Sequence, residues 1–164
     1  MFKDPRLDEL STGFRRTPLH IAVISGDKRL AKDIPSLRPD LALEKDRRGW
    51  TPLHLASARA SLKMVKLLLK AEPNASLPEA ICLKNNQNGE SILHFSVKSK
   101  SCIEAFELLV DKLALARISD PDIIINSKDY NGKTVLQLAA ETGNTEMVQY
   151  LLESTNLKLE ITDA

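Results

Sequence analysis

Residues 46–70 read DRRGWTPLHLASARASLKMVKLLLK, which predicts two short helices behind a tight turn. Gly49 can take the positive φ that such a turn needs, and Thr51 offers a hydroxyl that can cap a helix starting at Pro52. A second helix begins at Leu62, with its lysines on one narrow stripe and apolar residues nearly everywhere else. A helix that is apolar over most of its circumference needs packed neighbours on both sides. We therefore expect this helical pair to be stacked between similar pairs.

Related stretches recur along the chain. They read RTPLHIAVISGD around Thr17, NGESILHFSVKS around Ser91 and NGKTVLQLAAETGN around Thr134. Aligned on the capping hydroxyls of these residues and of Thr51, the repeats have periods of 34, 40 and 43 residues. A period of about 33 residues with a T-P-L-H-x-A core is the signature of ankyrin repeats. The chain therefore resembles the ankyrin-repeat family over roughly residues 17–153.

This resemblance implies an all-α, ankyrin-repeat solenoid of stacked helix–turn–helix units with β-turn fingers. We expect an N-terminal capping segment in residues 1–16 and a C-terminal tail in residues 154–164. Between them, the four repeats are expected at residues 17–50, 51–90, 91–133 and 134–153. The two longer periods place insertions between an outer helix and the next turn, where they extend loops without disturbing the stack.

Some local features depart from the repeat pattern. Short helices are expected at Asp4–Leu10 and Pro78–Ile81, and a short extended apolar piece at Ile123–Ile125. The first outer helix, around Lys28–Ile34, should stop before Pro35, because proline disrupts a helix interior. Ala60 stands where other repeats have a helix-ending glycine, and left-handed geometry at an alanine costs about 1 kcal/mol.

The outer helix of the last repeat is as apolar as that of an internal repeat. It places Met147, Val148, Tyr150, Leu151 and Leu152 among a few polar residues. A terminal repeat should instead present a polar outer side to water. Either the tail covers this side, or something else does, and association between chains through this helix is one such arrangement.

Composition and charge limit the classes of function. The chain has 164 residues, 43% hydrophobic residues and a net charge of +1, so we expect one domain with no general attraction to nucleic acid. Residues 1–82 carry 15 Lys+Arg against 10 Asp+Glu, whereas residues 83–164 carry 8 against 12. The N-terminus does not read as a secretory signal, and no apolar run approaches the roughly 20 residues of a membrane helix. A cytoplasmic protein without membrane insertion is the expectation.

The three histidines are the natural candidates for acid–base chemistry or metal binding. His20, His54 and His94 each follow a capping Thr or Ser by three residues. At that position the ring can bond the cap and the neighbouring turn backbone, tying one repeat to the next, so we interpret all three as structural. Cys82 and Cys102 are isolated. No catalytic residue, metal site or cofactor is therefore predicted, and the chain is not expected to be an enzyme.

The resemblance implies that partners bind in a concave groove lined by the turn tips and the inner helices. The candidate groove residues at matching positions are Arg16, Arg47, Arg48, Trp50, Arg59, Gln87, Asn88, Lys98, Tyr130, Asn131 and Lys133. Trp50 is the only tryptophan and stands where packing does not require one, and Trp and Arg dominate interface hot spots. The alternative is that Trp50 lies flat on neighbouring turns. The arginines favour an acidic protein partner over nucleic acid, because no aromatic residues are interleaved with them to stack bases. The other interpretation is that these arginines are simply solvated.

The phrase LRPDLALEKDRRGWTPLHLASA resembles plant ankyrin proteins of the membrane-associated, stress- and defence-signalling kind. The implied function is a non-catalytic protein–protein interaction module, an intracellular signalling adaptor or scaffold. One alternative is a competitive inhibitor built only of ankyrin repeats. Another is the soluble part of a membrane-anchored plant protein, and a plasma-membrane location would then require a C-terminal membrane segment.

Overall fold

The computed structural model describes residues 13, 15–71, 81, 83–99, 103–115 and 121–154. The predicted helix Asp4–Leu10, the tail after Ser154 and all but Ile81 of the predicted helix Pro78–Ile81 lie outside these residues. All regular elements in the described part are helical, so the expected all-α fold is confirmed.

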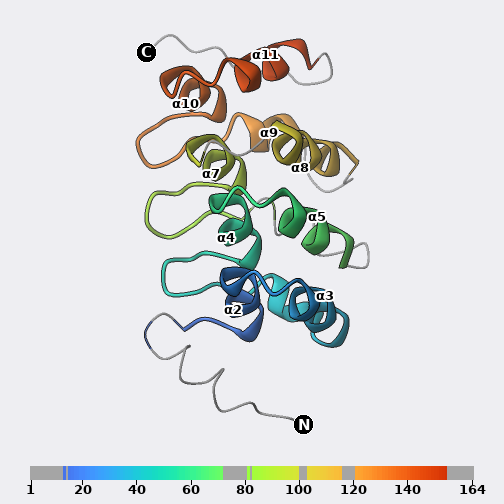
Figure 1. Ribbon diagram of the computed structural model, residues 1–164. Coiled ribbons are helices and arrows are strands. Elements are labelled where there is room, and N and C mark those ends of the chain that lie inside the picture. The colour runs from blue at the N-terminus through green and yellow to red at the C-terminus, as the bar shows by residue number, and fades with distance from the viewer. Residues whose placement is uncertain are drawn as a thin grey trace.

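The helices stand in two columns that run from the N-terminus to the C-terminus (Figure 1). The inner column contains α2 (Pro18–Ser25), α4 (Pro52–Ala58), α7 (Ile92–Lys98) and α10 (Val135–Glu141). The outer column contains α3 (Lys28–Leu37), α5 (Leu62–Ala71), α8 (Ile103–Leu115) and α11 (Thr145–Glu153). Two short helices, η1 (Pro39–Ala42) and α9 (Pro121–Ile125), follow the first and third outer helices. Successive inner helices contact one another, as do successive outer helices, which is the expected stack.

The predicted caps set the start of each inner helix. Thr17, Thr51, Ser91 and Thr134 have extended backbones, and each forms a capping box with the side chain three residues later. In α10 the partner is Gln137, whose Oε1 accepts from the Thr134 N–H at 3.0 Å. A capping box satisfies donors that a helix start otherwise leaves open, so the same local sequence starts a helix in every repeat.

The helix α5 has the two-sided burial that its sequence predicts. Its lysine stripe, Lys63, Lys66 and Lys70, is exposed, whereas Met64, Val65, Leu68 and Leu69 are buried. Helix α3 packs on one side of α5 and helix α8 on the other. The core is therefore a continuous column between the two rows of helices, as the stacking argument requires.

Two local predictions are wrong. The predicted extended piece at Ile123–Ile125 is helical and belongs to α9, which starts at Pro121, a residue suited to a first helical turn. The helix α3 does not stop before Pro35 but continues to Leu37. Pro35 is buried in the stack, so its packing offsets the lost backbone hydrogen bond.

The predicted strain at Ala60 is present. Its φ is +52°, close to the +67° of Gly143 at the same position of the fourth repeat. After α2, α4 and α10 the backbone thus turns in the left-handed region, whether the residue is glycine or alanine.

Candidate partner-binding surface

The turn segments at residues 46–50, 85–90 and 129–133 form projecting fingers on the inner-helix side of the stack (Figure 1). We call these fingers, residues 15–16 and the last turns of the inner helices the finger surface. In the first finger, Asp46 Oδ1 accepts from the N–H groups of Arg48 and Trp50 at 2.9 and 3.0 Å. Asp129 holds the third finger with an equivalent pair of bonds. Each finger conformation is therefore fixed by an acceptor in its own sequence.

The fingers are also bonded to one another. The Asn86 N–H donates to the Arg48 carbonyl at 3.1 Å, and the Tyr130 N–H donates to the Asn88 carbonyl at 2.7 Å. These bonds need a close approach, because a Cβ on Gly49 would lie 2.5 Å from the Asn86 backbone nitrogen. The fingers thus form a row whose backbone is held before any partner arrives, which reduces the ordering cost of binding.

A second set of contacts joins the fingers through lysines that were not predicted to have a role. Lys45 Nζ donates to the Lys84 carbonyl at 3.0 Å, and Lys84 Nζ donates to the Lys128 carbonyl at 2.8 Å. The signal is visible in the sequence, since a lysine precedes each of Asp46, Asn85 and Asp129. Only the stacked structure shows that Lys45 and Lys84 each reach the next repeat.

Two of the three repeat histidines bond both a helix cap and the following finger. The Thr17 N–H donates to Nδ1 of His20 at 3.2 Å, so that nitrogen carries no proton, and Nε2–H donates to the Trp50 carbonyl at 2.8 Å. His94 bonds Ser91 and the Lys133 carbonyl in the same way. The His20 and His94 rings therefore each tie an inner helix to the following finger. The three histidines lie one per layer rather than in one pocket.

Burial keeps all three histidines neutral. Loss of solvation lowers the pKa of His20 and His94, and their bonds to finger carbonyls oppose the fall. Burial lowers the pKa of His54 to about 4. Its Nε2 forms no hydrogen bond of good geometry within the described residues, although the nearby Glu90 carbonyl still favours the charged ring. Neutral buried rings with their Nδ1 atoms committed to caps are poorly placed for acid–base chemistry.

The candidate groove residues lie on the finger surface, mostly exposed. Arg47, Arg48, Arg59, Gln87, Asn88, Lys98, Tyr130 and Asn131 are exposed, and Arg16, Trp50 and Lys133 are half-buried. The Arg48 guanidinium lies 5.9 Å from the centre of the Trp50 ring, a cation–π distance. The residues thus share one side of the stack, but their chemistry differs between repeats.

Trp50 packs against its neighbours in the stack. Its ring meets the ring of Phe95 edge-on, with centroids 4.8 Å apart, and it packs against the core. Phe95 belongs to α7, so the contact joins the first finger to the third inner helix. Trp50 therefore combines structural packing with a half-exposed position beside Arg48.

Two ion pairs, which the sequence did not predict, cross the finger surface. Lys98 at the end of α7 pairs with Glu90, and Lys133 Nζ lies 2.7 Å from Oε1 of Glu141 at the end of α10. The charges are reversed between the two pairs: the finger supplies the carboxylate of Glu90 in one and the ammonium of Lys133 in the other. Both show that the base of a finger and the last turn of its inner helix lie within reach of each other.

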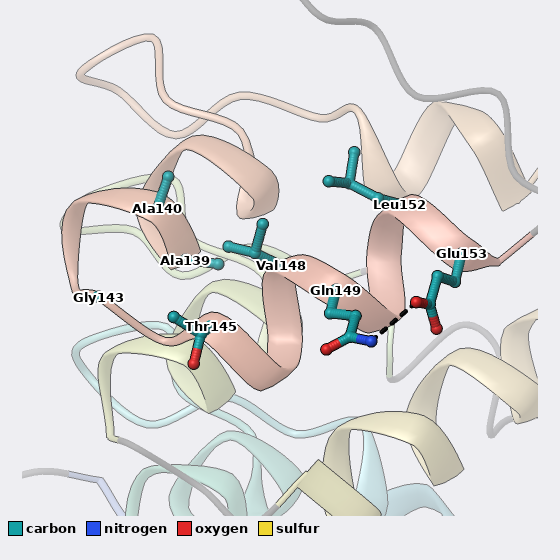
Figure 2. Close-up of a pocket in the computed structure, with 8 residues that line it drawn as sticks. All are labelled: Ala139, Ala140, Gly143, Thr145, Val148, Gln149, Leu152 and Glu153. Atoms are coloured by element: carbon teal, nitrogen blue, oxygen red, sulfur yellow. Dashed lines mark hydrogen bonds between the residues drawn. The ribbon is translucent and has the colours of Figure 1, made fainter.

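The last repeat carries an apolar hollow on the side that points away from the stack. It has a volume of about 470 Å³, and Figure 2 shows Ala140, Val148 and Leu152 projecting from the same side of the α10–α11 pair. Gln149 and Glu153 bond each other at its edge, at 2.8 Å. Leu152 is 56% exposed. Within the described residues, Val148 and Leu152 of α11 therefore line a hollow that is open to solvent, whereas Met147 and Leu151 are buried.

The comparisons with known proteins agree with this architecture. A family model described as ankyrin repeats (3 copies) matches residues 2–79, 19–122 and 76–163. The chain belongs to the ankyrin-repeat family. Ankyrin repeats mediate protein–protein interactions, and the family is typically non-enzymatic.

The curated relatives that the chain matches are animal proteins. It is 29% identical over 161 residues to the nuclear factor NF-kappa-B p105 subunit of Gallus gallus, covering 83% of this chain and 16% of that protein. It is 32% identical over 142 residues to the B-cell lymphoma 3 protein homolog of Mus musculus, covering 84% and 28%. It is 28% identical over 146 residues to inversin of Canis lupus familiaris, covering 86% and 12%. The chain thus spans under a third of the length of each.

Within the described residues, no helix is long and apolar enough to cross a membrane. The same part of the chain holds no group of three or more His, Cys, Asp or Glu side chains arranged to hold a metal ion.

Proposed function

We propose that this chain is a non-catalytic adaptor or scaffold that binds a protein partner on its finger surface, in the concave groove that the resemblance implies. The observation that carries the proposal is the row of exposed side chains on fingers that are already bonded to one another. Preorganised backbone with exposed Arg and Tyr side chains is what a protein-binding surface needs. An acidic partner suits the arginines around the first finger.

We place this adaptor in the cytoplasm and in plant-type defence and stress signalling. The support is the phrase LRPDLALEKDRRGWTPLHLASA and its resemblance to plant ankyrin proteins. In this proposal a plasma-membrane location depends on a C-terminal membrane segment. An extract of stressed plant tissue is therefore the first source in which to look for the partner.

Affinity capture with two matched variants tests the finger surface. The finger variant combines Arg48→Glu, Asn88→Ala and Tyr130→Ala, all at exposed positions. The control variant is Lys63→Glu with Lys66→Glu, on the exposed stripe of α5. Proteins identified by mass spectrometry should be retained by the wild type and the control and lost from the finger variant. Equal capture by all three proteins would reject the finger surface as the binding site.

The competitive-inhibitor alternative uses the same surface and is separated by a displacement assay. An inhibitor excludes another ligand from its captured partner, whereas an adaptor leaves that ligand bound. Adding the chain to a preformed complex of the partner and its ligand distinguishes the two, because only an inhibitor releases the ligand.

The open hollow on α10 and α11 favours a second contact, association between chains through the last helix. Val148 and Leu152 contribute its apolar surface. Sedimentation velocity over a range of concentrations should show larger species that Val148→Glu with Leu152→Glu removes. A wild-type chain that stays monomeric at high concentration would exclude this contact.

A further inference from the structure

Four equivalent positions at the base of the fingers differ in chemistry from repeat to repeat. The residue just before each capping hydroxyl is Arg16, Trp50, Glu90 or Lys133. The residue seven positions after the hydroxyl, in the last turn of the inner helix, is Ile24, Ala58, Lys98 or Glu141. The ion pairs of the third and fourth repeats show that these two positions face each other.

In the third and fourth repeats the charged residues at these two positions pair with each other. The Glu90 carboxylate is buried, and besides Lys98 it accepts from Nδ2 of Asn85 and Asn88 at 3.3 and 3.4 Å. Lys133 and Glu141 form the reversed pair in the next layer. An acidic partner residue that approached Lys98 or Lys133 would meet a cation whose charge a carboxylate of this chain already offsets. Its attraction to the partner is weaker for that reason, so it contributes little net affinity.

In the first and second repeats the residue seven positions after the capping hydroxyl is not acidic. Ile24 and Ala58 are half-buried apolar residues, so neither can pair with the base of a finger. Arg16 turns instead to the buried Asp46, with Nε 3.8 Å from Oδ2. Around Trp50 stand the exposed Arg47, Arg48 and Arg59. We call Arg47, Arg48, Trp50 and Arg59 the arginine half of the finger surface.

We propose that an acidic segment of the partner protein binds the arginine half, and that the third and fourth repeats contribute shape but no charge recognition. This inference rests on the proposed function, since it names where on the finger surface the partner's charge is read. The argument is charge complementarity: exposed guanidiniums attract carboxylates bidentately, and Trp50 offers an apolar and aromatic surface between them. The cations of the other two repeats are matched internally by Glu90 and Glu141.

The probe is a short fluorescein-labelled peptide of alternating glutamate and leucine, with a glutamine-for-glutamate version as its uncharged control. Binding is measured by fluorescence anisotropy and located by NMR of the ¹⁵N-labelled chain. Trp50 gives the only indole N–H signal, so it reports directly on the arginine half. The variant is Arg47→Glu with Arg48→Glu, and Lys63→Glu with Lys66→Glu on α5 carries the same change of charge away from the fingers.

We expect shifts concentrated at the Trp50 indole and the amides around Arg47 and Arg59. Affinity should fall about tenfold or more in the Arg47→Glu, Arg48→Glu variant and for the glutamine peptide, and weaken with added salt, with little change in the α5 control. Shifts centred on the third and fourth repeats, with affinity unchanged in the arginine variant, would overturn this inference but leave the finger surface as the binding site. Shifts confined to the outer helices would count against both proposals. No binding of the glutamate peptide would overturn the inference alone, because the capture experiment decides the proposed function independently.

Discussion

The second and fourth repeats have closely matching local structures but different surroundings. Residues 46–70 align with residues 129–153 without a gap, from the finger acid to the outer helix. Yet Leu69 of α5 is 3% exposed, whereas Leu152 at the equivalent position of α11 is 56% exposed. The difference arises because α8 covers α5, and no described element covers α11. A repeat's own sequence thus fixes its shape, and its neighbours decide what each side chain contributes to stability.

The largest expected effect is the difference in stability loss between alanine substitutions at the equivalent residues Leu69 and Leu152. Leu69→Ala should lower the free energy of unfolding by about 2–5 kcal/mol, because it leaves a cavity between α5 and its neighbours. Leu152→Ala should cost under about 1 kcal/mol, because an exposed side chain leaves no cavity. Urea unfolding followed by circular dichroism measures both. Equal losses would mean that α11 is covered in solution as α5 is.

The second prediction concerns pH, through His54 and its counterpart Gln137. Well above pH 6.5 the ring is neutral in both the folded and the unfolded chain, so its protonation does not lower the free energy of unfolding. Between pH 6.5 and about 4 the unfolded chain binds a proton that the folded ring refuses, so stability falls as the pH falls. From the pKa of about 4, the loss from this one residue is on the order of 3 kcal/mol.

The matched variant is His54→Gln, since Gln137 already forms this capping box in the fourth repeat. Unfolding free energies measured from pH 7 to pH 4 should fall less steeply in the variant than in the wild type. His20 and His94, whose pKa values are also lowered, remain in both proteins and keep part of the slope. Identical slopes would contradict the buried, neutral state of His54.

The third prediction compares the finger glycines Gly49 and Gly132, which share a φ of +76°. Gly132→Ala should cost about 1–2 kcal/mol, the penalty of left-handed geometry, because a Cβ there meets nothing within 4 Å. Gly49→Ala should cost about 1–3 kcal/mol more, because its Cβ would collide with Asn86 in the next finger. Thermal unfolding ranks the two. A similar loss at both sites would show that the fingers are not in close contact.

The smallest expected effect comes from substitutions at Ala60 and Gly143, the equivalent residues after two inner helices. Ala60→Gly should stabilise the chain by about 1 kcal/mol, because glycine adopts the observed positive φ without strain. Gly143→Ala should destabilise the chain by a similar amount. A Cβ at this position meets nothing within 4 Å, so the loss reports the backbone strain and not a steric clash. Denaturant midpoints of the two variants should move in opposite directions. Movement in the same direction would contradict the shared left-handed geometry.

The repeat pattern predicted most of the fold from local information. Capping residues, turn glycines and apolar faces act within a few residues of one another, so they can be found in one sequence. The two wrong local predictions have different causes. At Pro35 burial in the stack outweighs the local preference, whereas at Ile123–Ile125 the prediction overlooked Pro121 as a helix start. The packing contact of Trp50 was missed because its partner Phe95 lies on α7, 45 residues further along the chain.

The candidate binding residues were predicted as a set, but their grouping was not. Sequence placed all of them on one side by analogy between repeats. It did not show that Lys98 and Lys133 are matched by Glu90 and Glu141. In the second repeat the corresponding position in the last turn of the inner helix is Ala58, which cannot form an ion pair. Pairing depends on side chains eight residues apart meeting across a turn, which repeat spacing alone does not reveal.

By itself, the sequence determined the repeat unit, its caps and turns, and the structural place of the histidines, because these follow from contacts between near neighbours in the chain. The tertiary structure decided which apolar positions are buried and how the fingers bond one another. Those properties depend on the layer above and the layer below, and stacking brings together residues that are about 30 to 45 positions apart.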